Sequence, residues 1–251
     1  MDQYDAVTHL YPENAMTTTS PATAERAASI IADYFRPPIL TLESIAQPVA
    51  EHIAAELSRG AMSANKLDAL IAPFADQLFE SIDAPVYGAG FIAAIDLLSD
   101  SRSHLAWWQG QERRKLILAA QTVNKERIDY SELEWFRVPL MSGTSHVAGP
   151  YVDYLCSDEY TMTIATPVRV DGTFVGVLAF DLLIDSVERQ LTPLFRDLSA
   201  HVTLVNGVSR VVVSTDAEWA TGDVIRSGTI EGHTRISCEG IALDVLVGAV
   251  D

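Results

Sequence analysis

Cysteine is scarce in this sequence, and no metal-binding pattern accompanies it. Cys156 and Cys238 are the only two cysteines, and they lie far apart with no CxxC spacing. This pattern favours reduced or partly buried thiols over a disulfide framework or a cysteine-ligated zinc site. The six histidines are scattered without the spacing of metal ligands. We therefore expect neither a metal nor another cofactor.

Basic side chains and long apolar runs are also few. Lysine and arginine total 17 against 34 aspartates and glutamates, a formal net charge of −17. An acidic surface repels phosphate backbones and anionic lipids, which argues against nucleic acid as a partner. No stretch approaches the ~20 consecutive apolar residues of a membrane span. The N-terminal stretch MDQYDAVTHLYPENAMTTTS lacks the basic and apolar regions of a signal peptide. We expect a cytoplasmic protein without a membrane partner.

Familiar catalytic motifs are missing as well. The sequence contains no HExxH, GxSxG, P-loop or GxGxxG motif. The glycines of GAGF, residues 88–91, lie inside a strand-like run, where they are typical of a bulge or a close backbone approach. We therefore expect a protein that is not an enzyme. A hydrolase with Asp153 and Asp181 as its acid and base is an alternative that no nucleophile or metal triad supports.

The first third of the chain has a helical pattern. Residues 1–21 lack apolar periodicity and are expected to form a flexible leader. Over residues 22–83, apolar side chains recur every three or four residues, which predicts amphipathic helices. We expect a break at Pro37-Pro38 and kinks at Pro48 and Pro73, because proline removes a helical hydrogen bond. Such helices pack against the chain's own core or a second copy, so a homodimer through them is expected.

The period changes at residue 84, where strand-like segments begin. Residues 84–200 are expected to form a core of antiparallel strands, with a hairpin turn at Asp171-Gly172. Residues 201–251 carry two more hairpin signals, at Asn206-Gly207 and Glu239-Gly240. Hairpins with flanking helices favour an α+β fold with a mostly antiparallel sheet. The last segment is expected to be a β extension of the core or a small second lobe.

Aromatic and acidic residues cluster in the second half of the core. A buried aspartate needs hydrogen bonds or a cationic ligand to offset its desolvation. For a single aspartate the structural explanation, hydrogen bonds within the fold, is favoured. Two acids among aromatic rings favour a ligand, because ring faces attract ammonium groups. Tyr151 and Asp153 share a face of one strand since side chains alternate. The candidate ligand-binding residues are Trp135, Phe136, Tyr151, Asp153, Asp181, Tyr130 and Trp108.

Four short motifs follow one another along this core. They are Trp135-Phe136, Pro150-Tyr151-Val152-Asp153, Thr166-Pro167-Val168 and the run from Gly172 to Asp181. Their order and spacing resemble the Cache family of PAS-like sensor domains, also called PDC domains, and within it the soluble single-Cache type. The resemblance covers about residues 22–200. It implies a PAS-like antiparallel sheet behind a long N-terminal helix, and a module that senses a small molecule.

The resemblance also implies roles for single residues. The aromatic residues Trp135, Phe136 and Tyr151 would frame the ligand, Asp181 would take its ammonium group, and Asp153 would be a second acid.

One position departs from the amino-acid-binding members of the family. They carry an arginine for the ligand carboxylate two residues before the tryptophan, where this sequence has Leu133. Arg113, Arg114 or Arg137 would have to replace it. The departure favours a cationic amine over a zwitterion as the ligand. An amino-acid-like metabolite, another metabolite such as a carboxylate, and a protein-interaction module with a vestigial pocket remain alternatives.

Overall fold

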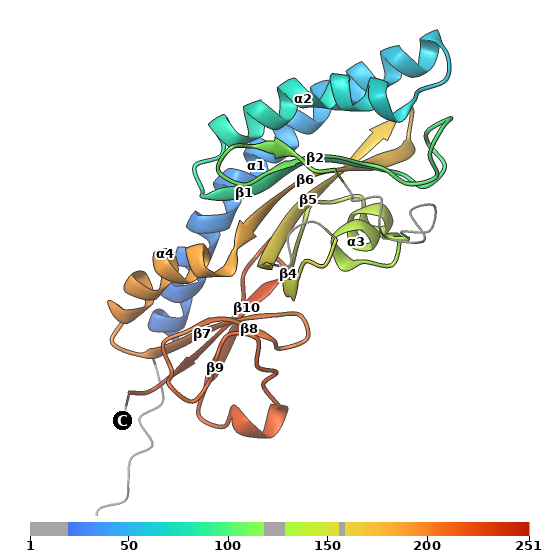
Figure 1. The fold of residues 1–251 in the computed structure, drawn as a ribbon. Coiled ribbons are helices and arrows are strands. Elements are labelled where there is room, and N and C mark those ends of the chain that lie inside the picture. Colours follow the sequence, from blue (N-terminus) through green and yellow to red (C-terminus); the bar gives the residue numbers. More distant parts are fainter. Residues whose placement is uncertain (1–19, 118–128, 156–158, 251) are drawn as a thin grey trace, which may run out of the picture.

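The chain forms two lobes, each built on one antiparallel sheet (Figure 1). This computed structural model describes residues 20–117, 129–155 and 159–250. The predicted leader over residues 1–21 lies almost entirely outside the described residues. The antiparallel sheets and flanking helices confirm the predicted α+β fold, with its PAS-like core and long N-terminal helix.

The first lobe holds a six-stranded sheet with the strand order β3-β2-β1-β6-β5-β4. The longest two strands, β5 and β6, form the hairpin that Asp171-Gly172 predicts, and both turn residues have positive φ. The strands are β1 Val86–Ala93, β2 Leu105–Gln109, β3 Arg114–Lys115, β4 His146–Val152, β5 Tyr160–Val170 and β6 Thr173–Leu183.

Helix α1, Pro21–Arg59, runs behind both lobes (Figure 1). The predicted break at Pro37-Pro38 is wrong, since the helix continues through these residues and through Pro48. Each proline removes one backbone hydrogen bond, but a continuous buried stripe on one face of α1 offsets that loss. The buried side chains of this stripe include Ala24, Ala27, Ile31, Phe35, Leu42, Ile45, Val49 and Ile53.

Helix α2, Ala64–Ser81, folds back beside α1 and continues through Pro73. Its first turn is capped by Ser63, whose hydroxyl accepts a hydrogen bond from the backbone of Lys66 at 3.4 Å. Both helices cover one face of the first sheet. The opposite face is left to helix α3, Glu134–Ser142, and the loops around it.

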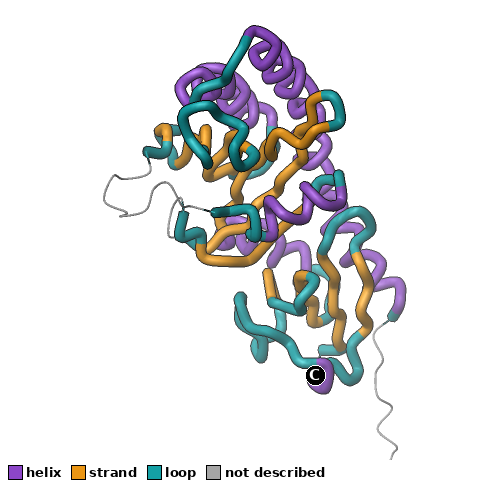
Figure 2. The backbone as a smooth tube through the Cα atoms, turned by 90° about the vertical axis from the view of Figure 1, so that its right-hand side faces the viewer, coloured by secondary structure: helices purple, strands orange, loops and turns teal. Residues whose placement is uncertain are grey.

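The second lobe is a four-stranded sheet with the order β8-β7-β10-β9. Figure 2 shows its strands as a group separate from those of the first lobe. Hairpins turn at Asn206-Gly207 and near Glu239-Gly240, as the sequence predicts. The elements are α4 Ile184–Arg196, β7 His201–Asn206, β8 Val211–Ser214, the short 3₁₀ helix η2 Ser227–Thr229, β9 Thr234–Ser237 and β10 Leu243–Gly248.

Asn206 joins the two lobes. Its buried side-chain amide donates a hydrogen bond to the backbone oxygen of Gly149 in β4 at 2.8 Å. Its own oxygen accepts hydrogen bonds from the backbones of Val208 and Arg210, at 3.1 and 2.9 Å. The turn after β7 in the second lobe is therefore hydrogen-bonded to β4, the strand that carries Tyr151.

Candidate functional site

A small cavity lies on the face of the first sheet that α1 and α2 leave open. Strands β1, β2, β4, β5 and β6 and helix α3 contribute to it, because alternate residues along a strand point to the same side of the sheet. About 20 Å³ of the cavity is free, which is room for about one water molecule. Its lining residues are Ile92, Leu105, Trp107, Trp135, Tyr151, Asp153, Thr163 and Asp181.

Asp181 lies at the centre of the sheet rather than at its edge. In β6 it pairs with Gly88 of β1 on one side and with Thr163 of β5 on the other. Its carboxyl accepts a hydrogen bond from the Thr163 hydroxyl at 2.5 Å, and the residue is only 4% exposed. Burial raises the pKa of Asp181 well above its ordinary value, and the nearby Asp153 raises it further, while the Thr163 hydrogen bond opposes both. The charged carboxylate is therefore unfavourable in the cavity unless a proton or a cation neutralises it.

Tyr151 and Asp153 form the wall beside Asp181. The Tyr151 hydroxyl is hydrogen-bonded to the Thr163 hydroxyl, which in turn donates to Asp181. Asp153 follows the last residue of β4, is 6% exposed, and accepts a hydrogen bond from the backbone of Leu155 at 3.1 Å. The two side chains that strand alternation places together thus do line one cavity.

Of the predicted aromatic residues near α3, one lines the inner cavity and two pack behind it. Trp135 lines the cavity, whereas Phe136 and Tyr130 pack behind it and are outside its lining. The Tyr130 ring lies 5.1 Å from that of Phe136 and 6.1 Å from that of Trp135. Its hydroxyl donates to the backbone oxygen of Ala93 at 2.6 Å, and burial raises the pKa of Tyr130 to about 12. Tyr130 and Phe136 therefore position Trp135.

Trp108 is not at the cavity. Its side chain packs on the face of the sheet that α1 and α2 cover. The neighbouring residue, Trp107, lines the cavity instead. Adjacent residues of a strand point to opposite faces of the sheet, so Trp107 and Trp108 cannot both line the cavity. The prediction that Trp108 lines the pocket is therefore wrong by one position.

A second, outer cavity of about 330 Å³ adjoins the inner one. The two share Trp135, Tyr151 and Asp153, and the outer walls are mostly apolar. Leu133, at the position of the arginine in the family motif, is 38% exposed there. The outer lining residues are Leu133, Glu134, Trp135, Tyr151, Val152, Asp153, Tyr154 and Leu155. Together the cavities offer an acidic inner end and an apolar outer end.

Comparison with known families decides what kind of domain carries this site. The sequence matches the family described as "Methyl-accepting chemotaxis protein-like, first PDC sensor domain" over residues 91–189. Residues 91–189 form a PDC sensor domain. This stretch contains Trp135, Tyr151, Asp153 and Asp181.

Solved structures similar to this chain extend beyond the PDC domain and over both lobes. Methyl-accepting Chemotaxis protein X is 14% identical, with a TM-score of 0.62, over 90% of this chain and 96% of that one. The ligand-binding domain of the Pseudomonas aeruginosa PAO1 chemoreceptor PctB, in complex with L-Arg, is 18% identical, with a TM-score of 0.57, over 90% and 91%. That of the Pseudomonas fluorescens chemoreceptor CtaA, in complex with L-valine, is 18% identical, with a TM-score of 0.59, over 92% and 94%. The second lobe is therefore part of the shared fold.

A curated relative shares a shorter stretch. Methyl-accepting chemotaxis protein PscA of Pseudomonas syringae pv. tomato (strain ATCC BAA-871 / DC3000) is 29% identical over 84 residues. These residues are 34% of this chain and 13% of that receptor, so the comparison concerns a small part of the relative.

Two absences apply to residues 20–117, 129–155 and 159–250. No helix within these ranges has the length and apolar character needed to span a bilayer. Within the same ranges, no group of three histidine, cysteine or acidic side chains is arranged to hold a metal ion.

Several residues that line the inner cavity are not among the ligand-binding residues predicted from the sequence. Trp107, Leu105, Ile92 and Thr163 all lie on the cavity face, and alternation within their strands carries the signal. In TMTIATP, residues 161–167, the small or polar side chains alternate with apolar Met162 and Ile164. This alternation indicates that Thr163 faces away from the helices, but only once the strand is assigned.

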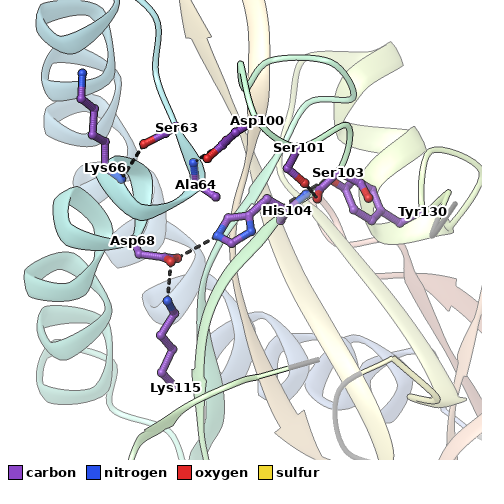
Figure 3. Close-up of polar contacts among 10 residues, drawn as sticks. All are labelled: Ser63, Ala64, Lys66, Asp68, Asp100, Ser101, Ser103, His104, Lys115 and Tyr130. Carbon is purple, nitrogen blue, oxygen red and sulfur yellow. Dashed lines mark hydrogen bonds and ion pairs between the residues drawn. The ribbon is translucent and has the colours of Figure 1, made fainter. Parts of the chain in front are cut away.

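A polar cluster ties α2 to the strands that carry the cavity wall of the PDC domain (Figure 3). Asp68 points from α2 toward His104, at 2.8 Å from its Nε2 atom, and toward Lys115 of β3. Burial opposes the ionisation of Asp68, but the hydrogen bonds and charges of His104 and Lys115 outweigh it and lower the pKa of its carboxyl. His104 directly precedes Leu105 of the cavity, and its backbone accepts and donates hydrogen bonds with the Tyr130 hydroxyl.

Replacing Asp68 by asparagine is expected to destabilise the protein by about 1 to 2 kcal/mol at pH 7, since Lys115 is partly exposed. The folded-state pKa of Asp68 lies below its unfolded value, so its contribution is present above about pH 4 and is lost as pH falls through the folded-state pKa. Denaturant unfolding from pH 2.5 to 7 measures the difference. Asp76→Asn, at an exposed position of the same helix, is the matched control. An equal loss in both variants, or a loss that persists at low pH, would contradict this role of Asp68.

Proposed function

We propose that this chain is a sensor that binds a small molecule with a protonated amino group, either a cationic amine or an amino-acid-like metabolite. One observation carries the proposal. Two buried carboxyl groups and the rings of Trp135 and Tyr151 line one cavity, and no lysine, arginine or histidine is among its described lining residues. A ligand cation is attracted to these carboxyl groups, and aromatic faces add to its attraction.

The positions of the three arginines considered as partners for a ligand carboxylate support a ligand that needs no such contact. Arg113 lies 4.9 Å from the Phe79 ring, Arg114 pairs with Glu112, and Arg137 is exposed beside Met141. None of them lines either cavity among the described residues. The apolar outer cavity around Leu133 suits the carbon skeleton of the ligand.

The similar structures support the amino group as the common feature. PctB and CtaA are named in complex with L-Arg and L-valine, and both amino acids carry an ammonium group. Amino acids therefore belong among the ligands to test, beside amines that lack a carboxylate.

The proposal extends to signalling. Ligand binding neutralises Asp181 and Asp153, and it shifts the protein toward the pocket conformation that binds the ligand better. The strands of that pocket pack on α1 and α2, so the output passes through these helices, in a homodimer formed by them. A cytoplasmic location remains the prediction from sequence, and the chain acts by binding rather than by catalysis.

A thermal-shift screen tests the proposal. Amines and amino acids are expected to raise the melting temperature, and carboxylates without an amino group are expected to leave it unchanged. The shift should grow as pH rises through the elevated folded-state pKa of Asp181, because the protonated carboxyl does not attract a cation. Stabilisation by carboxylates alone would favour the alternative of a carboxylate sensor. A lack of any shift across the screen would favour a protein-interaction module with a vestigial pocket.

A further inference from the structure

Trp107 reaches across the sheet toward the acidic end of the inner cavity. The strand order is β2-β1-β6. Gly88 of β1 pairs with Asp181 of β6 on one side and with Gln109 of β2 on the other, two residues along β2 from Trp107. A side chain at Gly88 would be impossible without movement, because its Cβ would lie 2.7 Å from the Trp107 Nε1 atom. The indole nitrogen therefore lies over Gly88, on the side of the ring that faces the strand of Asp181.

The indole N–H of Trp107 has no acceptor among the residues that the structure describes. Trp107 is 2% exposed and lines the inner cavity. A tryptophan N–H can only donate, and leaving a buried donor without an acceptor is unfavourable. The free space of about 20 Å³ accommodates one water molecule or one small group of a ligand next to it.

The other polar groups of the described lining already form a directed chain. The Tyr151 and Thr163 hydroxyls are bonded to each other, and the Thr163 hydroxyl donates to Asp181. The carboxylates accept hydrogen bonds, so they suit the ammonium group of a ligand. Trp107 offers a hydrogen-bond donor, rather than an acceptor, at the same end of the cavity.

We propose that Trp107 donates its N–H to an oxygen of the ligand and thereby selects amines with an acceptor close to the nitrogen. This inference rests on the proposed function and narrows its ligand class to amino alcohols, amino amides and amino acids over plain alkylamines. One N–H contacts a single oxygen and carries no full charge, so a neutral hydroxyl or carbonyl suffices in a pocket where the arginine position is Leu133.

Ethanolamine and n-propylamine test the inference, because they differ only in a hydroxyl and a methyl group at one end. Isothermal titration of the wild type is expected to show about tenfold tighter binding of ethanolamine. Trp107→Phe removes the N–H but keeps a ring, and is expected to bring the two affinities together while n-propylamine still binds. Trp108→Phe, on the opposite face of the same strand, is expected to keep the tenfold preference.

The possible failures are distinguishable. If the wild type binds both amines equally, the role of Trp107 is overturned while the proposed function stands, and this result needs no variant. A preference that persists in Trp107→Phe overturns it as well. If neither these amines nor L-alanine binds the wild type, both the inference and the proposed amine site fail.

Discussion

Asp181→Asn is expected to weaken amine binding by about 100-fold or more, because a charge-assisted hydrogen bond becomes a neutral one. Asparagine keeps the size of the side chain and can still accept the Thr163 hydrogen bond. The empty protein should become more stable at neutral pH, since the variant no longer buries an ionisable group. Binding and stability thus change in opposite directions, which is typical of a functional site.

The pH dependence of unfolding distinguishes the loss of the Asp181 carboxyl from a change in packing as the cause of the higher stability of Asp181→Asn. The folded-state pKa of Asp181 is raised, so the folded protein holds this proton more tightly than the unfolded chain. Wild-type stability therefore falls as pH rises from about 4 through the folded-state pKa, and the variant lacks this contribution to the fall. Calorimetric unfolding of both proteins from pH 4 to 8 is expected to show a difference that grows with pH.

Asp185→Asn is the matched control for Asp181→Asn. Asp185 is exposed in the first turn of α4, four residues along the chain. Its replacement is expected to leave amine affinity unchanged. Unchanged affinity in Asp181→Asn itself would remove this residue from the site.

Gly176→Ala is expected to destabilise the protein by roughly 3 kcal/mol, which lowers the melting temperature by about 10 °C in a chain of this size. Gly176 has a φ of +149°, which side-chain-bearing residues rarely adopt. A Cβ there would lie 2.3 Å from the backbone oxygen of Ile92 and 2.5 Å from the Phe91 ring. Neither neighbour can retreat, because both belong to the central strand β1.

Gly207→Ala is the control for this glycine. Gly207 lies in the exposed turn between β7 and β8, and a Cβ there would meet no atom within 4 Å. Its replacement is expected to change stability by no more than about 0.5 kcal/mol. Thermal unfolding of the two variants is the measurement, and equal melting temperatures would contradict the close backbone approach at Gly176.

Short sequence patterns correctly predicted the features of this fold that depend on neighbouring residues alone, namely the turns, the apolar stripe of α1 and the glycine-rich part of β1. Asp171-Gly172 marks a real turn, because both residues have positive φ angles that aspartate and glycine tolerate. Asn206-Gly207 also lies at a turn, where the Asn206 side-chain oxygen accepts hydrogen bonds from the backbones of Val208 and Arg210. The apolar stripe of α1 also follows from spacing alone. The glycines of residues 88–91 lie where predicted, at a register shift beside a close backbone approach.

Features that depend on distant contacts were not predictable in this way. Proline chemistry favours a break at Pro37-Pro38, but packing of α1 on the core outweighs it, and packing is invisible in a single segment. The choice between Trp107 and Trp108 depends on which face of β2 meets the helices, and nothing in the local sequence WW decides this. The separate second sheet depends on the pairing of β7 with β10, whose paired residues are at least 37 positions apart, as for Asn206 and Leu243.

The length of α1 has a mechanical consequence. Its 39 residues span about 58 Å, and its apolar stripe packs on strands of both lobes. Strand β5 carries Thr163 on the cavity face and Met162 and Ile164 on the face that packs toward this helix. A tilt of the helix by about 5° at one end displaces the other end by roughly 5 Å. Because one continuous helix contacts the pocket strand β5 and the strands β9 and β10 of the second lobe, a tilt of α1 would carry a movement from one lobe to the other.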